Sequence, residues 1–149
     1  MSFLDIGFNI MTTFFFEDTE PIVIEERTRT WLHHIISSEG KKPGDLQYIF
    51  CSDDYLLQVN RDYLQHDYYT DIITFDYVKG QTISGDIFVS LQRISDNAAV
   101  LGQDFDRELH RVLAHGVLHL CGYKDKTEAE ISEMRFKEDY YLARRDLII

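Results

Sequence analysis

The sequence contains little cysteine, no long apolar run and few basic residues. Its two cysteines are too few for a disulfide framework, and each follows an apolar stretch, so both are expected in the core as reduced thiols. No apolar run reaches the roughly 18 residues that a membrane span needs. The first ten residues lack the basic segment of a signal peptide and include Asp5. We therefore expect a cytoplasmic protein, with residues 1–10 as a dispensable extension before an alternative start at Met11.

The shortage of positive charge restricts the partners that the chain can bind. It has 15 Lys and Arg residues against 26 Asp and Glu residues, a net charge of −11. Proteins that bind nucleic acid usually carry a basic surface, because neutralising phosphates releases counterions. A nucleic-acid function must here depend on a local basic groove, a metal or a partner. The alternative is that the acidic charge only keeps the protein soluble.

The hydrophobic pattern predicts one α+β domain over residues 1–149, without repeats or low-complexity linkers and with only two prolines. We expect a mixed sheet of about four strands, and helices that include a buried central metal-binding helix. Predicted strands cover 12–16, 46–51, 72–77 and 85–90, and 41–44 and 65–69 are predicted loops. Predicted helices cover 25–38, 52–64, 91–100, a stretch from Asp104 or Asp106 to the stop at Gly122, and 127–145, where Thr127 and Glu130 form a capping box.

The segment His-Gly-Val-Leu-His-Leu-Cys-Gly-Tyr-Lys-Asp at 115–125 has the spacing of a metal site. His115 and His119 are four residues apart on an otherwise apolar helix, so they point the same way. A turn follows at Gly122, and it can bring Asp125 back toward the imidazoles. Two imidazoles and a carboxylate can form an open three-ligand site for one divalent ion, zinc in the first place. The alternative is a pair of buried histidines that only bond to their neighbours.

The residues around His115 and His119 restrict the reactions that a metal bound there could catalyse. The spacing parallels the long metalloprotease signature, which has a general-base Glu directly after its first histidine, where this chain has Gly116. Peptide hydrolysis by that route is therefore disfavoured, although zinc would still lower the pKa of bound water to about 7. The glycine costs about 1 kcal/mol in helix propensity and suggests a close approach at this point. Cys121 lies roughly 200° around the helix from His119, so it is expected in the core rather than on the metal.

The segment His115–Asp125 resembles the signature of the YbeY family of metal-dependent endoribonucleases. Asn60 with Tyr63, residues 70–75 and residues 85–87 resemble further motifs of that family, in the right order. The resemblance covers about Leu57 to Lys126. It implies an α+β fold, one zinc-type ion and a single-stranded RNA substrate. It also implies a role in ribosomal RNA maturation, chiefly at the small-subunit 3′ end, and in ribosome quality control, with the ribosome or small-subunit proteins as partners.

The chain departs from the family pattern at two places. The third family histidine falls at Asp125, whose oxygen is also a zinc ligand but makes the site more anionic and more open to manganese. The family arginine that would hold a phosphate falls at Leu64. Arg61, on the same helical face, and Lys124, beside the metal ligand, are the candidate catalytic cations in its place. We favour Arg61 because a guanidinium can bind a phosphate through two hydrogen bonds.

Other residues are candidates for holding RNA. Tyr69 and Thr70 are the predicted substrate-binding residues, and Tyr68 and Tyr69 can stack on unpaired bases or only pack a loop. Asp71 can accept a hydrogen bond from a metal-bound imidazole or cap a turn. We expect a basic rim around the metal, drawn from Arg61, Arg107, Arg111, Lys124 and Lys126.

Three functions compete at this point. The leading one is a metal-dependent endoribonuclease that acts on ribosomal RNA precursors. The second is a metal hydrolase of another substrate class, such as a peptide or a small phosphoester. The third is a ribosome-assembly factor without catalysis, in which the metal is structural. The acidic net charge is an argument for this third function, because it disfavours tight binding of RNA as a substrate.

Overall fold

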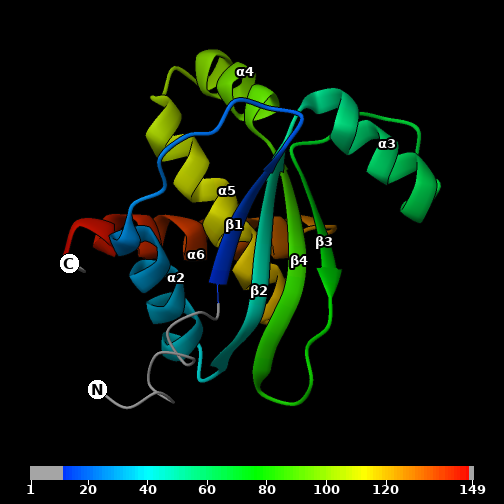
Figure 1. Ribbon diagram of the computed structural model, residues 1–149. Coiled ribbons are helices and arrows are strands. Elements are labelled where there is room, and N and C mark those ends of the chain that lie inside the picture. Colours follow the sequence, from blue (N-terminus) through cyan, green and yellow to red (C-terminus); the bar gives the residue numbers. More distant parts are fainter. Residues whose placement is uncertain (1–11, 148–149) are drawn as a thin grey trace, which may run out of the picture.

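The computed structural model describes residues 12–147, so the predicted extension at residues 1–10 lies outside the described residues (Figure 1). All predicted strands and helices are present in their predicted order. They are β1 (Thr12–Glu17), α2 (Glu26–Ser38), β2 (Lys42–Cys51), α3 (Asp53–Leu64), β3 (Ile72–Asp76), β4 (Thr82–Ser90), α4 (Leu91–Leu101), α5 (Phe105–Leu120), α6 (Glu128–Arg144) and the 3-10 turn η1 (Arg145–Leu147).

The strands form one four-stranded mixed sheet in the order β1-β2-β4-β3. β1, β2 and β4 run parallel, and β3 pairs with β4 antiparallel. Both parallel pairs need crossovers, which pass through α2 and α3, whereas β3 and β4 follow one another as a hairpin. This confirms the predicted fold class.

One predicted loop, residues 41–44, is wrong, because β2 begins at Lys42. Lys42 and Pro43 pair with Thr82 and Ile83 of β4, and a bulge follows before Leu46. β4 is accordingly longer than predicted at its start. The polar and Pro-Gly composition of this stretch hides a strand end whose pairing partner is 40 residues away.

The main core lies on one face of the sheet, where α2 and α5 pack and α6 covers α5 (Figure 1). α5 is buried along most of its length, which confirms the predicted buried central helix. Gly116 faces the sheet: a Cβ there would lie 3.1 Å from Ile87 Cδ1 and 3.3 Å from Ile72 Cδ1. The missing side chain therefore lets the helix approach β3 and β4 closely, as the sequence suggested.

The opposite face is covered at one edge by α3. A smaller apolar cluster joins this helix to β3 and β4 through Leu56, Val59, Ile73, Phe75 and Phe88. Alternate residues of β3 therefore face different layers, and Ile72 belongs to the main core side while Ile73 faces α3. Both faces of β3 are thus packed, one toward α5 and the other toward α3, while within the described chain only its edge along β4 is paired.

Other expectations concern the cysteines and the membrane. Cys51 is buried and Cys121 is partly buried, both are free thiols, and burial raises their pKa to about 12 and about 11. Within residues 12–147, no helix is both long enough and apolar enough to cross a membrane.

Candidate metal centre

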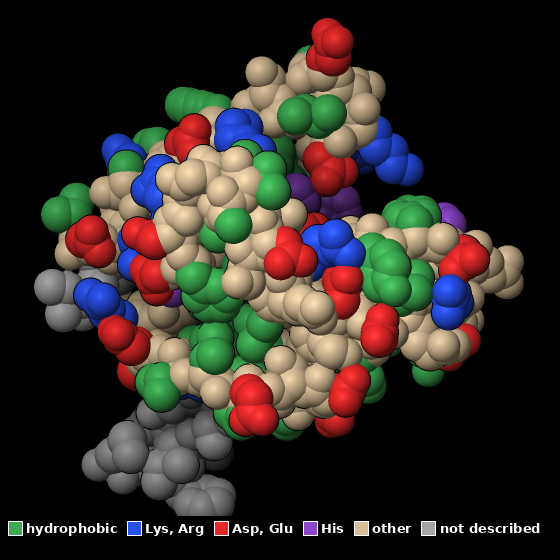
Figure 2. All heavy atoms as spheres, turned by 90° about the horizontal axis from the view of Figure 1, so that it is seen from above, with side chains coloured by type: hydrophobic (Ala, Val, Ile, Leu, Met, Phe, Trp, Pro, Cys, Tyr) green, Lys and Arg blue, Asp and Glu red, His purple; other side chains and the backbone are tan. Residues whose placement is uncertain are grey.

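A cleft of about 530 Å³ lies between α5, α6, β3 and the segment that joins α3 to β3. Its wall on α5 is a single helical stripe formed by Glu108, Arg111, Val112, His115 and His119. The stripe runs over twelve residues, from Glu108 to His119, or about 16 Å of helix. Seen from above, histidine side chains lie in a hollow that both basic and acidic side chains border (Figure 2).

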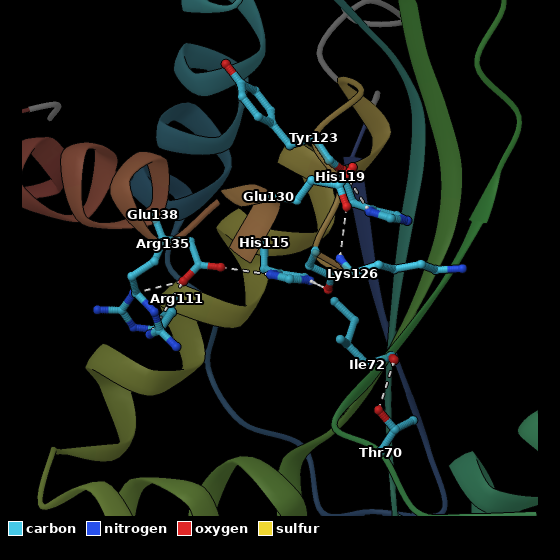
Figure 3. Close-up of polar contacts among 11 residues, drawn as sticks. Thr70, Ile72, Arg111, His115, His119, Tyr123, Lys126, Glu130, Arg135 and Glu138 are labelled. Carbon is cyan, nitrogen blue, oxygen red and sulfur yellow. Dashed lines mark hydrogen bonds and ion pairs between the residues drawn. The ribbon is translucent and has the colours of Figure 1, made fainter. Parts of the chain in front are cut away.

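The two imidazoles are held in parallel by different partners. Their ring planes differ by 6° and their centroids are 6.3 Å apart. His115 Nδ1 lies 2.8 Å from Glu138 Oε2, and His119 Nδ1 lies 3.0 Å from the carbonyl oxygen of Tyr123 (Figure 3). A carbonyl can only accept, so His119 Nδ1 donates and carries the proton. Its Nε2 then keeps the lone pair that a metal needs.

Asp125 approaches the pair from the turn after α5. Its Oδ2 lies 3.2 Å from His115 Nε2, and its side chain is 41% exposed. Within residues 12–147, no three His, Cys, Asp or Glu side chains already converge as a metal site. The donor chemistry nevertheless fits a divalent ion: both Nδ1 atoms have an oxygen partner, and a carboxylate lies against one Nε2. His115, His119 and Asp125 therefore stay the predicted ligands.

Buried charges surround these residues. Burial raises the pKa of Asp71 and of Glu108. Burial also acts to raise the pKa of Glu138, but hydrogen bonds from His115 and Arg111 outweigh it and the pKa is lowered. Conversely, burial acts to lower the pKa of His115, and Glu138 outweighs this effect and raises it. The cleft thus favours an ionised Glu138 beside His115.

Glu138 contacts both the predicted metal ligand His115 and the guanidinium of Arg111. Its Oε1 accepts from Arg111 Nη1 at 2.8 Å, while Oε2 contacts His115. Arg111 also donates to Asp139 Oδ1 at 2.7 Å, so two ion pairs join α5 to α6. Figure 3 shows Arg111, Arg135 and Glu138 together on one side of His115, with Lys126 on the other side. These contacts fix α6 against the metal-binding helix.

The predicted catalytic cations lie away from the cleft lining. Arg61 is exposed, and its Nε lies 2.5 Å from Asp67 Oδ1. Neither Arg61 nor Lys124 lines the cleft, and the same holds for Arg107 of the predicted rim. Arg111 and Lys126 do line it.

The predicted substrate-binding residues divide in the same way. Thr70 and Tyr68 line the cleft, together with Asp71. Tyr69 does not line it: its hydroxyl donates to Asp54 Oδ1 at 3.2 Å, and its ring lies 5.2 Å from the Arg93 guanidinium. The Tyr68 ring instead stacks on His66, which also lines the cleft.

Four titratable residues of the cleft were not predicted from the sequence: His66, Glu108, Arg135 and Glu138. Arg135 and Glu138 share one face of α6, three residues apart, but this helix carries many charges. No local pattern shows that this face returns to α5. Glu108 could have been predicted as a cleft residue, because it lies two helical turns before His115 on the same face of the helix.

The amino-acid sequence matches a known protein family over most of its length. Residues 14–146 match the sequence model of the family described as Endoribonuclease YbeY, a family of metalloenzymes. The protein named Endoribonuclease YbeY from Cytophaga hutchinsonii is 55% identical over 90% of this chain and 96% of its own length. That from Phocaeicola vulgatus is 52% identical over 83% and 89%, and that from Flavobacterium johnsoniae is 50% identical over 93% and 95%.

The fold has a similar solved structure. The solution structure of TM1509 from Thermotoga maritima superimposes with a TM-score of 0.66 at 26% identity, over 91% of this chain and 89% of that one. The family match covers residues 14–146, which include the cleft residues on α5 and α6, and the fold match covers 91% of this chain. The chain therefore belongs to the YbeY endoribonuclease family.

Proposed function

We propose that this chain is a metal-dependent endoribonuclease that cuts single-stranded RNA during ribosomal RNA maturation, chiefly at the small-subunit 3′ end. The same activity would serve ribosome quality control in the cytoplasm, with the ribosome or small-subunit proteins as partners. His115, His119 and Asp125 would hold one divalent ion, zinc in the first place. The observation that carries this proposal is the pair of parallel imidazoles, each with its Nδ1 bonded to an oxygen, on the wall of an open cleft.

The chain's own residues orient the reacting groups. When bound, a divalent ion would supply Lewis acidity and lower the pKa of water. Glu138 and the Tyr123 carbonyl fix the ring orientations of His115 and His119. The stacked Tyr68 and His66 rings present an aromatic surface at the cleft, on which an unpaired base can stack. A paired base is already stacked in its duplex, so this surface favours single strands.

The position of Gly116 argues against peptide hydrolysis. A Cβ there would press against Ile87 and Ile72 of the sheet, and Gly116 does not line the cleft. The general-base glutamate of the metalloprotease signature has no equivalent place in this helix, so the peptide alternative loses its support.

The proposal is tested with purified protein and a labelled single-stranded RNA oligonucleotide, in the presence of zinc or manganese and with a chelator. We expect cleavage that the chelator abolishes and that His119→Ala lacks. Elemental analysis should find about one equivalent less metal in His119→Ala than in wild type. Equal metal contents would overturn the ligand assignment, and metal-bound wild type without cleavage would favour the structural-metal alternative.

A further inference from the structure

Cleavage of a phosphodiester needs a cation beside the reacting phosphate. The transition state gathers negative charge on the phosphate oxygens, and a positioned cation usually stabilises it. Neither Arg61 nor Lys124 lines the cleft. Among residues 12–147, the Lys and Arg side chains that do are Arg111, Lys126 and Arg135.

Arg111 is already committed to protein partners. Its two terminal nitrogens donate to Glu138 and Asp139 at 2.8 and 2.7 Å, and its side chain is only 8% exposed. Turning this guanidinium toward a substrate would leave the carboxylate of Glu138 buried with one partner fewer. Such a loss is costly, because an unpaired buried charge is strongly destabilising. Arg111 therefore serves the α5–α6 contact rather than the substrate.

Arg135 is in the opposite situation. Its side chain is 56% exposed, and its Nη1 lies 3.7 Å from Glu138 Oε1, beyond hydrogen-bond distance. Glu138 already has His115 and Arg111 at 2.8 Å each, so it stays paired if Arg135 moves away. Arg135 is thus a cation of the cleft that can turn to an incoming anion at small cost.

We propose that Arg135 is the phosphate-binding residue of this site, an inference that rests on the proposed endoribonuclease function. It lies one helical turn before Glu138, on the side of His115 that faces α6 (Figure 3). Its guanidinium can bind a phosphate through two hydrogen bonds, which the Lys126 ammonium on the other side of His115 does not offer. Arg135 of α6 would thus bind the phosphate, which is the role that the sequence had predicted for Arg61.

The test compares wild type, Arg135→Gln, Arg135→Lys, Lys126→Gln and Arg107→Gln. Arg107 is the matched control, because it is exposed on α5 and does not line the cleft. We expect Arg135→Gln to lower kcat/KM for single-stranded RNA by ~10²-fold or more, the scale of losing one transition-state donor. Arg135→Lys should recover part of the rate, and Arg107→Gln should stay close to wild type. Metal content and melting temperature should be the same in all five proteins.

Binding provides a second readout that does not depend on cleavage. The affinity of the metal-loaded proteins for a cleavage-resistant phosphorothioate RNA is measured by fluorescence anisotropy across a range of salt. Losing one phosphate contact should reduce the slope of log affinity against log salt by about 0.7 for a single strand. We expect this change for Arg135→Gln and not for Arg107→Gln.

The outcomes separate the two proposals. Equal losses in Arg135→Gln and Arg107→Gln, a loss confined to Lys126→Gln, or lower metal content in Arg135→Gln would each overturn the role of Arg135. If wild type cuts no RNA in any metal, the proposed function fails. The salt slopes still decide whether Arg135 holds a phosphate, and an unchanged slope in Arg135→Gln rejects it.

Discussion

Glu138 shows how one carboxylate can serve packing and chemistry together. Its two oxygens contact Arg111 and His115, so the ion pair that holds α6 on α5 also fixes the ring of a predicted metal ligand. The side chain is 6% exposed, and water therefore competes little for these contacts. An imidazole whose Nδ1 is bonded to a carboxylate is oriented and is a more basic metal ligand.

We predict that Glu138→Gln weakens metal binding by about 10- to 100-fold, the usual effect of losing a hydrogen-bond partner of a metal ligand. The amide keeps the size of the side chain but loses the charge that favours His115 as a ligand. Competition with a coloured chelator measures the affinity. Asp139→Asn is the control, because Asp139 also pairs with Arg111 but is 53% exposed and is not bonded to His115. Equal effects of the two substitutions would contradict a specific role for Glu138.

At the scale of elements, the turn that carries Asp125 is fixed by the end of α2. Glu39, which caps that helix, accepts hydrogen bonds from Tyr123 Oη at 2.6 Å, from Lys137 Nζ at 3.2 Å and from the Tyr141 hydroxyl. One carboxylate thereby joins α2, the turn after α5 and α6. The carbonyl of Tyr123 in turn holds His119, so this anchor supports the metal centre from outside the cleft.

These bonds predict a pH-dependent stability. Burial acts to raise the pKa of Glu39, but hydrogen bonds from Tyr123, Tyr141 and Lys137 outweigh it, and the pKa lies below the ordinary 4.5. A folded-state pKa below the unfolded one gives stability that is present above pH ~4.5 and is lost as the pH falls through the folded value. We expect Glu39→Gln to cost about 2 kcal/mol of unfolding free energy at pH 7, the scale of hydrogen bonds to a charged group.

Urea denaturation at pH 7 and at lower pH measures this effect. The difference between wild type and Glu39→Gln should shrink as the pH falls below the ordinary carboxyl value. Glu26→Gln, at the other end of α2 and 75% exposed, is the control and should show little change at either pH. A difference that stays constant with pH would show that the ionised carboxylate is not the source of the stability.

At the scale of the whole molecule, the net charge of −11 contrasts with an anionic substrate. Within the described chain, the cleft is lined by four carboxylates and three Lys or Arg side chains, so it has no excess of positive charge by itself. The carboxylates are Asp71, Glu108, Asp125 and Glu138. A divalent ion would make the summed charge of these side chains and the ion positive. The cleft could then attract an anion although the protein as a whole is acidic.

We therefore predict that RNA binding depends on the metal. Unit charges about 4 Å apart attract by about 4 kcal/mol at an effective dielectric constant of 20, so removing the ion should weaken binding by tenfold or more. Anisotropy with a phosphorothioate RNA, with and without a chelator, measures the change. His119→Ala should bind weakly in both conditions. Chelator-insensitive binding by wild type would place the RNA on another surface.

Much of this molecule follows from local patterns. Spacings of two, three or four residues are enough to predict the helix with His115 and His119 and the capping box at Thr127. They also predict the order of the strands and helices. Such spacings also place Glu108 and Arg111 on the stripe of the histidines. The start of β2 is the exception in the fold, because its pairing with β4 is a contact between distant residues.

The amino-acid sequence by itself determined the α+β class, the buried central helix and the histidine pair, because each depends on the periodicity of one short segment. Only the tertiary structure decided which charges meet in the cleft. Arg61 is three residues from Leu64 yet lies outside the cleft lining, while Arg135 and Glu138 reach it from a helix that begins after Asp125. The physical reason is that side chains from α6 reach His115 only through the packing of α6 on α5, which the sum of many distant contacts sets.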